Sequence, residues 1–183
     1  MKTLLTCSAL ALSFALSPLA YAHEEGSAKM VQTSPNAAKA PYDIQFLDTM
    51  AQHHREGIDM FKMGAEKAEN PKLKEMSQKM VDDQQKEISE LKSMRDGIKT
   101  DAPEAINRKL PGMMAMDMSK LESSTGKDFD RHFIDMTIKH HQGGVDMSRD
   151  ALKHAKSQEV KDKAKMIIDM QTKEIAEMKG MRN

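Results

Sequence analysis

The chain repeats part of its own sequence at an offset of 87 residues. When residues 46–95 are aligned with residues 133–182 without a gap, 18 of the 50 positions are identical. Each copy contains two stretches in which apolar residues recur every three or four positions, as on one face of an α-helix. The stretches are separated by Asn70-Pro71 in the first copy and by Ser157, a predicted N-cap, in the second. Two helical hairpins bury their apolar faces by packing together, so the sequence predicts an all-α four-helix bundle.

The segment before the first repeat has the features of an export signal. Lys2 precedes an apolar run, and Ala20-Tyr21-Ala22 matches a small-residue cleavage site, so residues 1–22 are predicted to be a cleaved signal peptide. The apolar run is too short to span a membrane. We therefore expect an exported protein without a membrane span.

The remaining chain divides into three parts. Residues 23–41 are small, polar and interrupted by prolines, which predicts a flexible N-terminal segment. Residues 42–183 are predicted to form the bundle domain, with one hairpin at 42–98 and the other at 128–183. A connector at 99–127, rich in methionine and broken by Pro and Gly, joins the hairpins.

Charge and residue usage narrow the function. The 28 basic residues are balanced by 28 acidic ones and aromatic residues are few, so no nucleic acid is expected as a partner. The only cysteine, Cys7, lies in the predicted signal peptide, whereas 17 of the 18 methionines follow that segment. Thioethers persist in an oxidising compartment and are soft ligands for Cu(I).

Each repeat carries two adjacent histidines, His53-His54 in the first and His140-His141 in the second. Neighbouring helix residues point about 100° apart. We therefore expect His54 and His141 to face the core, and His53 and His140 to lie beside Gly and Met. The methionines at helical spacing around the pairs are Met50, Met60, Met63, Met136 and Met147. Imidazole and thioether together suit Cu(I) and Ag(I), which predicts two related metal sites, with the Gly-flanked histidines as the first choice. The alternative is that the histidines hydrogen-bond between helices while the methionines fill the core.

A second group of methionines lies in the connector, between Pro and Gly residues. Its members are Met113, Met114, Met116 and Met118. Clustered thioethers on flexible backbone are able to wrap a soft cation. The alternatives are a hydrophobic plug over the end of the bundle and a partner-binding surface. After signal cleavage His23 would be the new N-terminus, where its amine and imidazole would chelate Cu(II).

Two glutamines, Gln84 and Gln171, fall on the apolar faces of the second and fourth predicted helices. A buried amide requires partners. We therefore expect these side chains to hydrogen-bond the histidine rings across each hairpin.

These motifs resemble those of a known bacterial family. The residues that carry the resemblance are Phe46-Leu47-Asp48, His53-His54, Gly57-Ile58-Asp59-Met60, the matching residues 133–147, and the hairpin endings at 82–88 and 169–175. They are similar to the CopM-like copper-binding proteins, part of a domain-of-unknown-function family with ferritin-like four-helix bundles. The resemblance covers residues 42–183. It implies periplasmic binding of copper, as Cu(I), and of Ag(I), through Met and His in copper resistance. Arg55-Glu56 departs from the second copy, which leaves open whether the two sites are equivalent.

The function that we predict is sequestration or hand-over of copper rather than catalysis, with metal ions and a copper exporter or another periplasmic carrier as partners. One alternative is a ferritin-like di-metal redox enzyme. Such enzymes use Glu-x-x-His motifs, and this sequence has neither that motif nor His-Glu-x-x-His. The other alternative is a methionine-rich structural bundle that binds protein partners.

Overall fold

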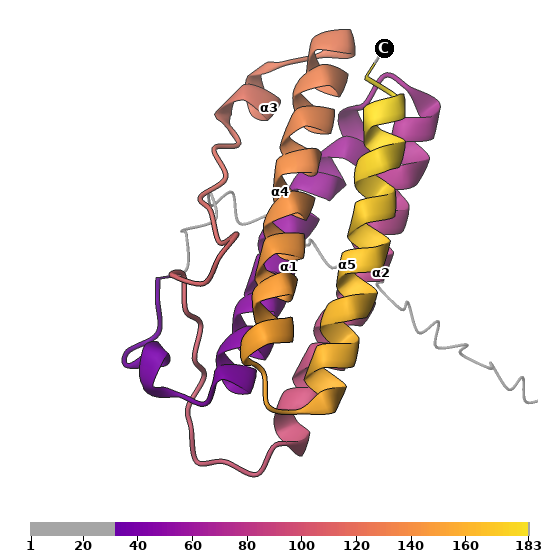
Figure 1. Ribbon diagram of the computed structural model, residues 1–183. Coiled ribbons are helices and arrows are strands. Elements are labelled where there is room, and N and C mark those ends of the chain that lie inside the picture. Colours follow the sequence, from indigo (N-terminus) through magenta and orange to yellow (C-terminus); the bar gives the residue numbers. More distant parts are fainter. Residues whose placement is uncertain (1–31, 183) are drawn as a thin grey trace, which may run out of the picture.

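The computed structural model describes residues 32–182, and every regular element in this part of the chain is a helix (Figure 1). The four long helices are α1 Tyr42–Lys67, α2 Pro71–Gly97, α4 Gly126–His154 and α5 Gln158–Gly180. Two short helices, η1 Ala37–Lys39 and α3 Ser119–Ser123, lie beside them. The prediction of an all-α four-helix bundle is confirmed. The predicted signal peptide lies outside the described residues.

The long helices form two antiparallel hairpins, with α1 of the first packed against α4 of the second. After α2 the connector runs back along the bundle, so that α4 starts at the end where α1 finishes (Figure 1). One long crossover of this kind is typical of ferritin-like bundles. Because α1 and α4 are antiparallel and occupy equivalent places in the repeats, an approximate two-fold axis relates the two hairpins.

Each hairpin turn is tied to the other repeat by an aspartate. Asp130 on α4 accepts hydrogen bonds from the backbone amides of residues 69–70, at 2.8 and 2.9 Å. Its equivalent, Asp43 on α1, accepts them from the amides of residues 156–157, at 2.8 and 3.1 Å. Ser157 is the N-cap residue of α5, as predicted, but its side chain makes no hydrogen bond to the start of the helix. The carboxylate of Asp43, which comes from another helix, holds this turn instead.

The interior contains two large apolar clusters, one toward each end of the bundle. The first includes Ile58, Met60, Phe61, Leu73, Met80, Phe129, Phe133 and Met178. The second includes Phe46, Leu47, Met50, Leu91, Met147, Val160 and Ile167. Among residues 32–182, no helix combines the length and the apolar composition that crossing a bilayer requires.

The connector is fastened along α1 by hydrogen bonds. In chain order, the contacts join Ala105 to Asp48, Asn107 to Thr49, Arg108 to Glu56 and Leu121 to Lys67. The partners advance along α1 in the same order, so the connector runs parallel to this helix. The segment before α1 joins it, since the amide of Ser34 donates to the carbonyl of Ile106 at 2.8 Å.

Candidate metal centre

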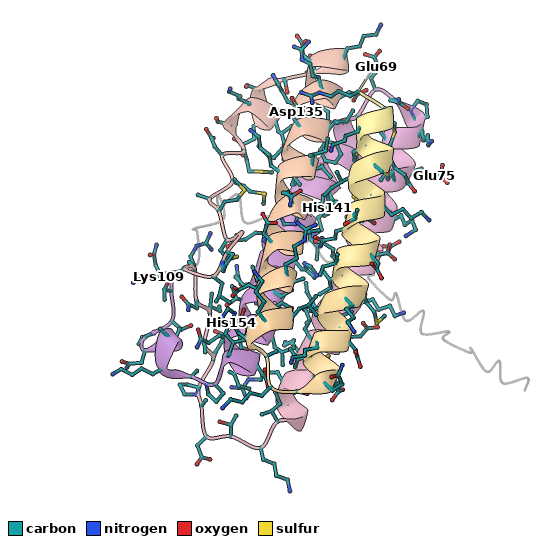
Figure 2. All side chains as sticks on the ribbon, viewed as in Figure 1. Glu69, Glu75, Lys109, Asp135, His141 and His154 are labelled. Atoms are coloured by element: carbon teal, nitrogen blue, oxygen red, sulfur yellow. The ribbon has the colours of Figure 1, made fainter. Side chains whose placement is uncertain are left out.

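Four histidines form a polar layer halfway along the bundle, between the two apolar clusters. His53 and His54 come from α1, His140 and His141 come from α4, and each side chain is at most 2% exposed. Figure 2 shows His141 near the middle of the bundle, well away from His154 at the end of the same helix. We call these four residues the histidine layer. Burial of polar rings at this depth is unfavourable unless their nitrogens find partners.

The rings of His53 and His140 stack on each other at the centre of this layer. Their centroids are 3.9 Å apart and their planes differ by 9°. The two residues are equivalent in the repeats, so the approximate two-fold axis passes between them. The sequence predicted two related sites, one for each histidine pair, and the structure brings both pairs together in one cluster. The antiparallel packing of α1 on α4 brings them together, and the sequence offset alone does not reveal that packing.

Burial keeps the stacked histidines neutral. It lowers the pKa of His53 to about 3 and the pKa of His140 well below 6.5, and the neighbouring histidines add to both shifts. Two imidazolium charges at the observed separation would repel by about 4 kcal/mol at an effective dielectric constant of about 20. Each of these rings therefore presents a free lone pair at neutral pH.

The other two histidines each face a glutamate of their own hairpin. Nε2 of His54 lies 3.0 Å from Oε2 of Glu87, and Nε2 of His141 lies 3.0 Å from Oε2 of Glu174. The first contact is a hydrogen bond. The second has a suitable distance without hydrogen-bond alignment, so neither ring nitrogen of His141 has a hydrogen-bond partner. The sequence analysis missed both glutamates as histidine partners, although the repeated Lys-Glu-Ile in the hairpin endings was a signal for them.

Glu87 also binds a buried lysine. Nζ of Lys163 lies 2.7 Å from Oε1 of Glu87 and 2.7 Å from Oε2 of Glu90. Burial alone would raise the pKa of Glu87, but its hydrogen bonds and charge interactions with His54 and Lys163 outweigh burial and lower the pKa to about 2. Glu87 is therefore an acceptor at neutral pH. Nε2 of His54 must carry the donated proton, which leaves the lone pair of this ring on Nδ1.

Several nitrogens of the histidine layer have no hydrogen-bond partner among the described residues. They are Nε2 of His53, Nδ1 of His54, Nε2 of His140 and both ring nitrogens of His141. An unsatisfied buried polar group costs about 1–3 kcal/mol, so a group of this size is unusual in a native interior. Neutral imidazole nitrogens are good ligands for copper and silver ions. The donor set therefore fits these metals.

The glutamines lie in the same layer but do not make the predicted hydrogen bonds. Oε1 of Gln84 and both polar atoms of the Gln171 amide lack partners. The prediction that they bond the histidine rings is therefore wrong. Glu87 and Glu174, which lie one helical turn further along, face the rings instead.

The glycines that follow the histidine pairs make room for side chains of the layer. A Cβ atom on Gly57 would lie 2.3 Å from Nε2 of His140. A Cβ atom on the equivalent Gly144 would lie 2.2 Å from Oε1 of Gln171. Gly57 therefore makes room for an imidazole edge together with the amide of Gln84, and Gly144 makes room for the amide of Gln171.

The methionines predicted as ligands on the helices lie on both sides of the histidine layer. Met50 and Met147 belong to one apolar cluster. Met60 belongs to the other, with the partly buried Met63 and Met136 packed against it. Thioethers therefore lie on both sides of the single histidine layer. The sequence had suggested a separate set of methionines for each histidine pair.

The four connector methionines are spread out rather than gathered. Met113 packs on one apolar cluster, Met116 and Met118 pack on the other, and Met114 is 43% exposed. The structure thus does not bring together the compact group of thioethers that the sequence suggested.

The connector passes next to the histidine layer at Gly112, which has a φ of 81°. A Cβ atom on Gly143 would lie 2.4 Å from the carbonyl oxygen of Gly112 and 3.4 Å from Cε1 of His53. Only a residue without a side chain fits at this crossing. Gly143 therefore lies between the connector backbone on its outer side and the ring of His53 on its inner side.

No group of three or more His, Cys, Asp and Glu side chains within residues 32–182 is arranged to hold a metal ion. The predicted ligand His23 lies outside the described residues.

Comparison with protein families finds one match. The profile of DUF305, a domain of unknown function, matches residues 20–95 and again residues 96–182. Each matched segment contains one hairpin, in agreement with the internal duplication. A search of curated proteins finds no match.

Solved structures include three informative neighbours. CopM in its Cu(I)-bound form is 32% identical, with 76% of this chain and 94% of that chain covered and a TM-score of 0.64. CopM co-crystallised with Ag gives 32% identity, 76% and 93% coverage and a TM-score of 0.64. A candidate secreted DUF305 protein from Streptomyces coelicolor is 21% identical over 75% of this chain and 90% of that chain, with a TM-score of 0.64, and shares the fold.

Proposed function

This chain belongs to the DUF305 family, and on that premise we propose that it binds Cu(I) and Ag(I) through the histidine layer and the methionines beside it. The similarity to CopM supports the choice of metal, since CopM has been crystallised with Cu(I), with Cu(II) and with Ag. Both monovalent ions prefer soft ligands and accept low coordination numbers.

The observation that carries the proposal is the set of unpartnered imidazole nitrogens in the histidine layer. Burial holds the rings of His53 and His140 neutral, so their lone pairs need not first lose a proton to bind a metal. Glu87 fixes the tautomer of His54 in the manner of the carboxylate partners of metal-bound histidines. Met60 and Met147, which are fully buried and equivalent in the repeats, supply thioethers on the two sides of the layer.

The role that fits this chemistry is sequestration or hand-over of copper outside the cytoplasm, in copper resistance. The expected signal peptide would deliver the chain to the periplasm, where thioethers remain reduced. A buried ion is shielded from redox cycling, which favours storage over turnover. The connector, with Met114 exposed and Gly112 close to the histidine layer, is suited to capture ions and pass them inward or to an exporter.

The test is an anaerobic titration with Cu(I) against a competing chelator. The wild-type protein is compared with a variant in which His53, His54, His140 and His141 are replaced by alanine. We expect the affinity to fall by about 100-fold, which corresponds to about 2.7 kcal/mol. His154→Ala is the matched control, because this histidine is exposed at the end of α4, and its affinity should stay within about twofold of wild type.

Circular dichroism of each variant separates loss of ligands from loss of fold. Equal affinity of the wild type and the folded four-histidine variant would refute the proposal. Tight iron binding with consumption of oxygen would favour the ferritin-like enzyme in its place.

A further inference from the structure

The two halves of the histidine layer differ at one buried position. The offset of 87 residues pairs His54 with His141 and Glu87 with Glu174. It pairs Lys163, however, with a methionine, Met76. Both Lys163 and Met76 are buried, at 6% and 8% exposure, so a positive charge in one half is replaced by a thioether in the other.

In the first half the lysine closes a charged network. Lys163 is within 2.7 Å of both Glu87 and Glu90, and Glu87 in turn accepts the hydrogen bond from His54. His54 is thus held in one tautomer, and the negative charge behind it is already balanced by a buried ammonium group. Glu87 therefore orients this imidazole, but a metal cation bound to the ring would gain little electrostatic stabilisation from its carboxylate.

In the second half the carboxylate lacks such a partner. Within residues 32–182 the only ion pair of Glu174 is with His141. The lysine that interacts electrostatically with Glu174 is Lys79, whose side chain is 68% exposed and is hydrogen-bonded to Asp83. Water screens an exposed charge far more than a buried one. The negative charge of Glu174 therefore remains available to stabilise a cation on His141, whose Nε2 lies 3.0 Å from this carboxylate and whose ring nitrogens both lack a hydrogen-bond partner.

We propose that the halves bind metal in order: the half with His141 and Glu174 takes the first Cu(I) or Ag(I), and Lys163 keeps the half with His54 from binding a second ion tightly. Lys163 is then the residue that sets the capacity of the layer. This inference rests on the proposed function, because it concerns the same imidazoles.

The decisive experiment is a titration of the whole protein with Ag(I), followed by the NMR signals of the histidine ring nitrogens. In the wild type, the first equivalent of Ag(I) should shift the ring nitrogens of His141 and leave those of His54 in place. Simultaneous shifts of His54 and His141 at the first equivalent would overturn the inference while leaving the proposed function intact. Absence of any histidine response would refute both.

Reciprocal substitutions give the matched test. Lys163→Met copies the second half into the first, and should tighten binding of a second Ag(I) by about tenfold or more. Met76→Lys does the reverse, and should weaken binding of the first ion by a similar factor. Lys79→Met removes an exposed charge near Glu174 and should change the first affinity by no more than about twofold. A folded Lys163→Met protein with unchanged second-ion affinity would overturn the inference.

A second pair of variants covers the case in which Lys163→Met fails to fold. Glu174→Gln should weaken the first ion by about tenfold, and Glu87→Gln should weaken it less than Glu174→Gln does, because the first ion binds in the other half. The opposite ranking of these two variants would also overturn the order that we propose.

Discussion

The two repeats of this bundle share their central residues but differ in what surrounds them. Both carry the stacked histidine, the second histidine and the glutamate behind it. In the first repeat the glycine after the histidines admits the ring of His140 as well as the amide of Gln84, whereas in the second the nearest atoms to the equivalent glycine all belong to the amide of Gln171. The first repeat's glutamate binds a buried lysine, and the second repeat's does not.

This difference follows from where each residue lies relative to the two-fold axis. The rings of His53 and His140 lie on either side of the two-fold axis and contact each other. A substitution of one ring therefore changes the surroundings of the other. Residues away from the axis face different neighbours and are free to diverge. Lys163 and Met76 occupy such a place. Gly57 and Gly144 are identical, but the side chains that they face differ. Predictions about the axis should therefore be symmetric, while predictions away from it should separate the repeats.

Acid should have the largest effect on the apo protein, and the effect should arise equally from both repeats. The folded-state pKa of His53 is about 3, below the value of about 6.5 expected in an unfolded chain. The unfolded state therefore binds more protons between these values. This contribution to stability is fully present above pH 6.5 and is lost as the pH falls toward 3. Between pH 8 and pH 5 we expect a loss of about 2 kcal/mol from His53, with His140 acting in the same direction. Urea unfolding across this pH range measures it.

Variants at the axis test the symmetry. His53→Leu and His140→Leu should each remove a comparable share of the pH dependence, because each deletes one buried neutral ring. Stability that does not change between pH 8 and pH 5 would show that the layer is protonated or hydrated in solution. A much larger effect of one variant than of the other would show that the rings are not equivalent.

Alanine at the repeated glycine should have a smaller effect and should separate the repeats. In Gly57→Ala the new methyl group would collide with Nε2 of His140, a rigid ring that is stacked on His53. We expect a loss of about 2 kcal/mol in the free energy of unfolding. In Gly144→Ala the collision is with the end of the flexible Gln171 side chain, so the loss should be nearer to about 1 kcal/mol.

Gly97→Ala is the control for these variants. Gly97 is also in a helix, and a Cβ atom there would meet nothing within 4 Å. Alanine should stabilise the protein by about 0.5 kcal/mol through the unfolded state and the helix propensity. Equal losses in Gly57→Ala and Gly144→Ala would contradict the difference between the two environments.

The sequence predicted the helices and the hairpins because both depend on local patterns. Apolar spacing marks helix faces, and Asn70-Pro71 marks a helix start, where the Asn70 side chain accepts a hydrogen bond from the amide of Lys72 at 2.9 Å. The repeat also indicated histidine and methionine as the candidate ligand types. What the sequence could not show was the direction of α4 relative to α1, since a long connector permits either direction.

That direction decides the site. With α4 antiparallel to α1, His53 meets His140 and the two predicted sites become one layer. Partners across a hairpin were equally hard to predict, because one helical turn separates Gln84 from Glu87 and both are buried. The choice between them depends on the rotation of α2 against α1. The lack of a side-chain hydrogen bond from Ser157 at the start of α5 has a related reason: the carboxylate that holds this turn, on Asp43, lies 114 residues away in the chain.

The smallest expected effect concerns the aspartates that tie each hairpin turn to the other repeat. Asp43 and Asp130 are equivalent, and each accepts two backbone hydrogen bonds in the opposite turn. Asp43→Ala and Asp130→Ala should each cost about 1 kcal/mol, as for the loss of a helix cap, with little difference between them. The pair therefore tests whether the repeats remain equal where their contacts are equal. Thermal melting of both variants, with Asp128→Ala as an exposed acidic control on α4, measures the effect. A clear difference between the two turns would show that the repeats have diverged in stability as well as at Lys163.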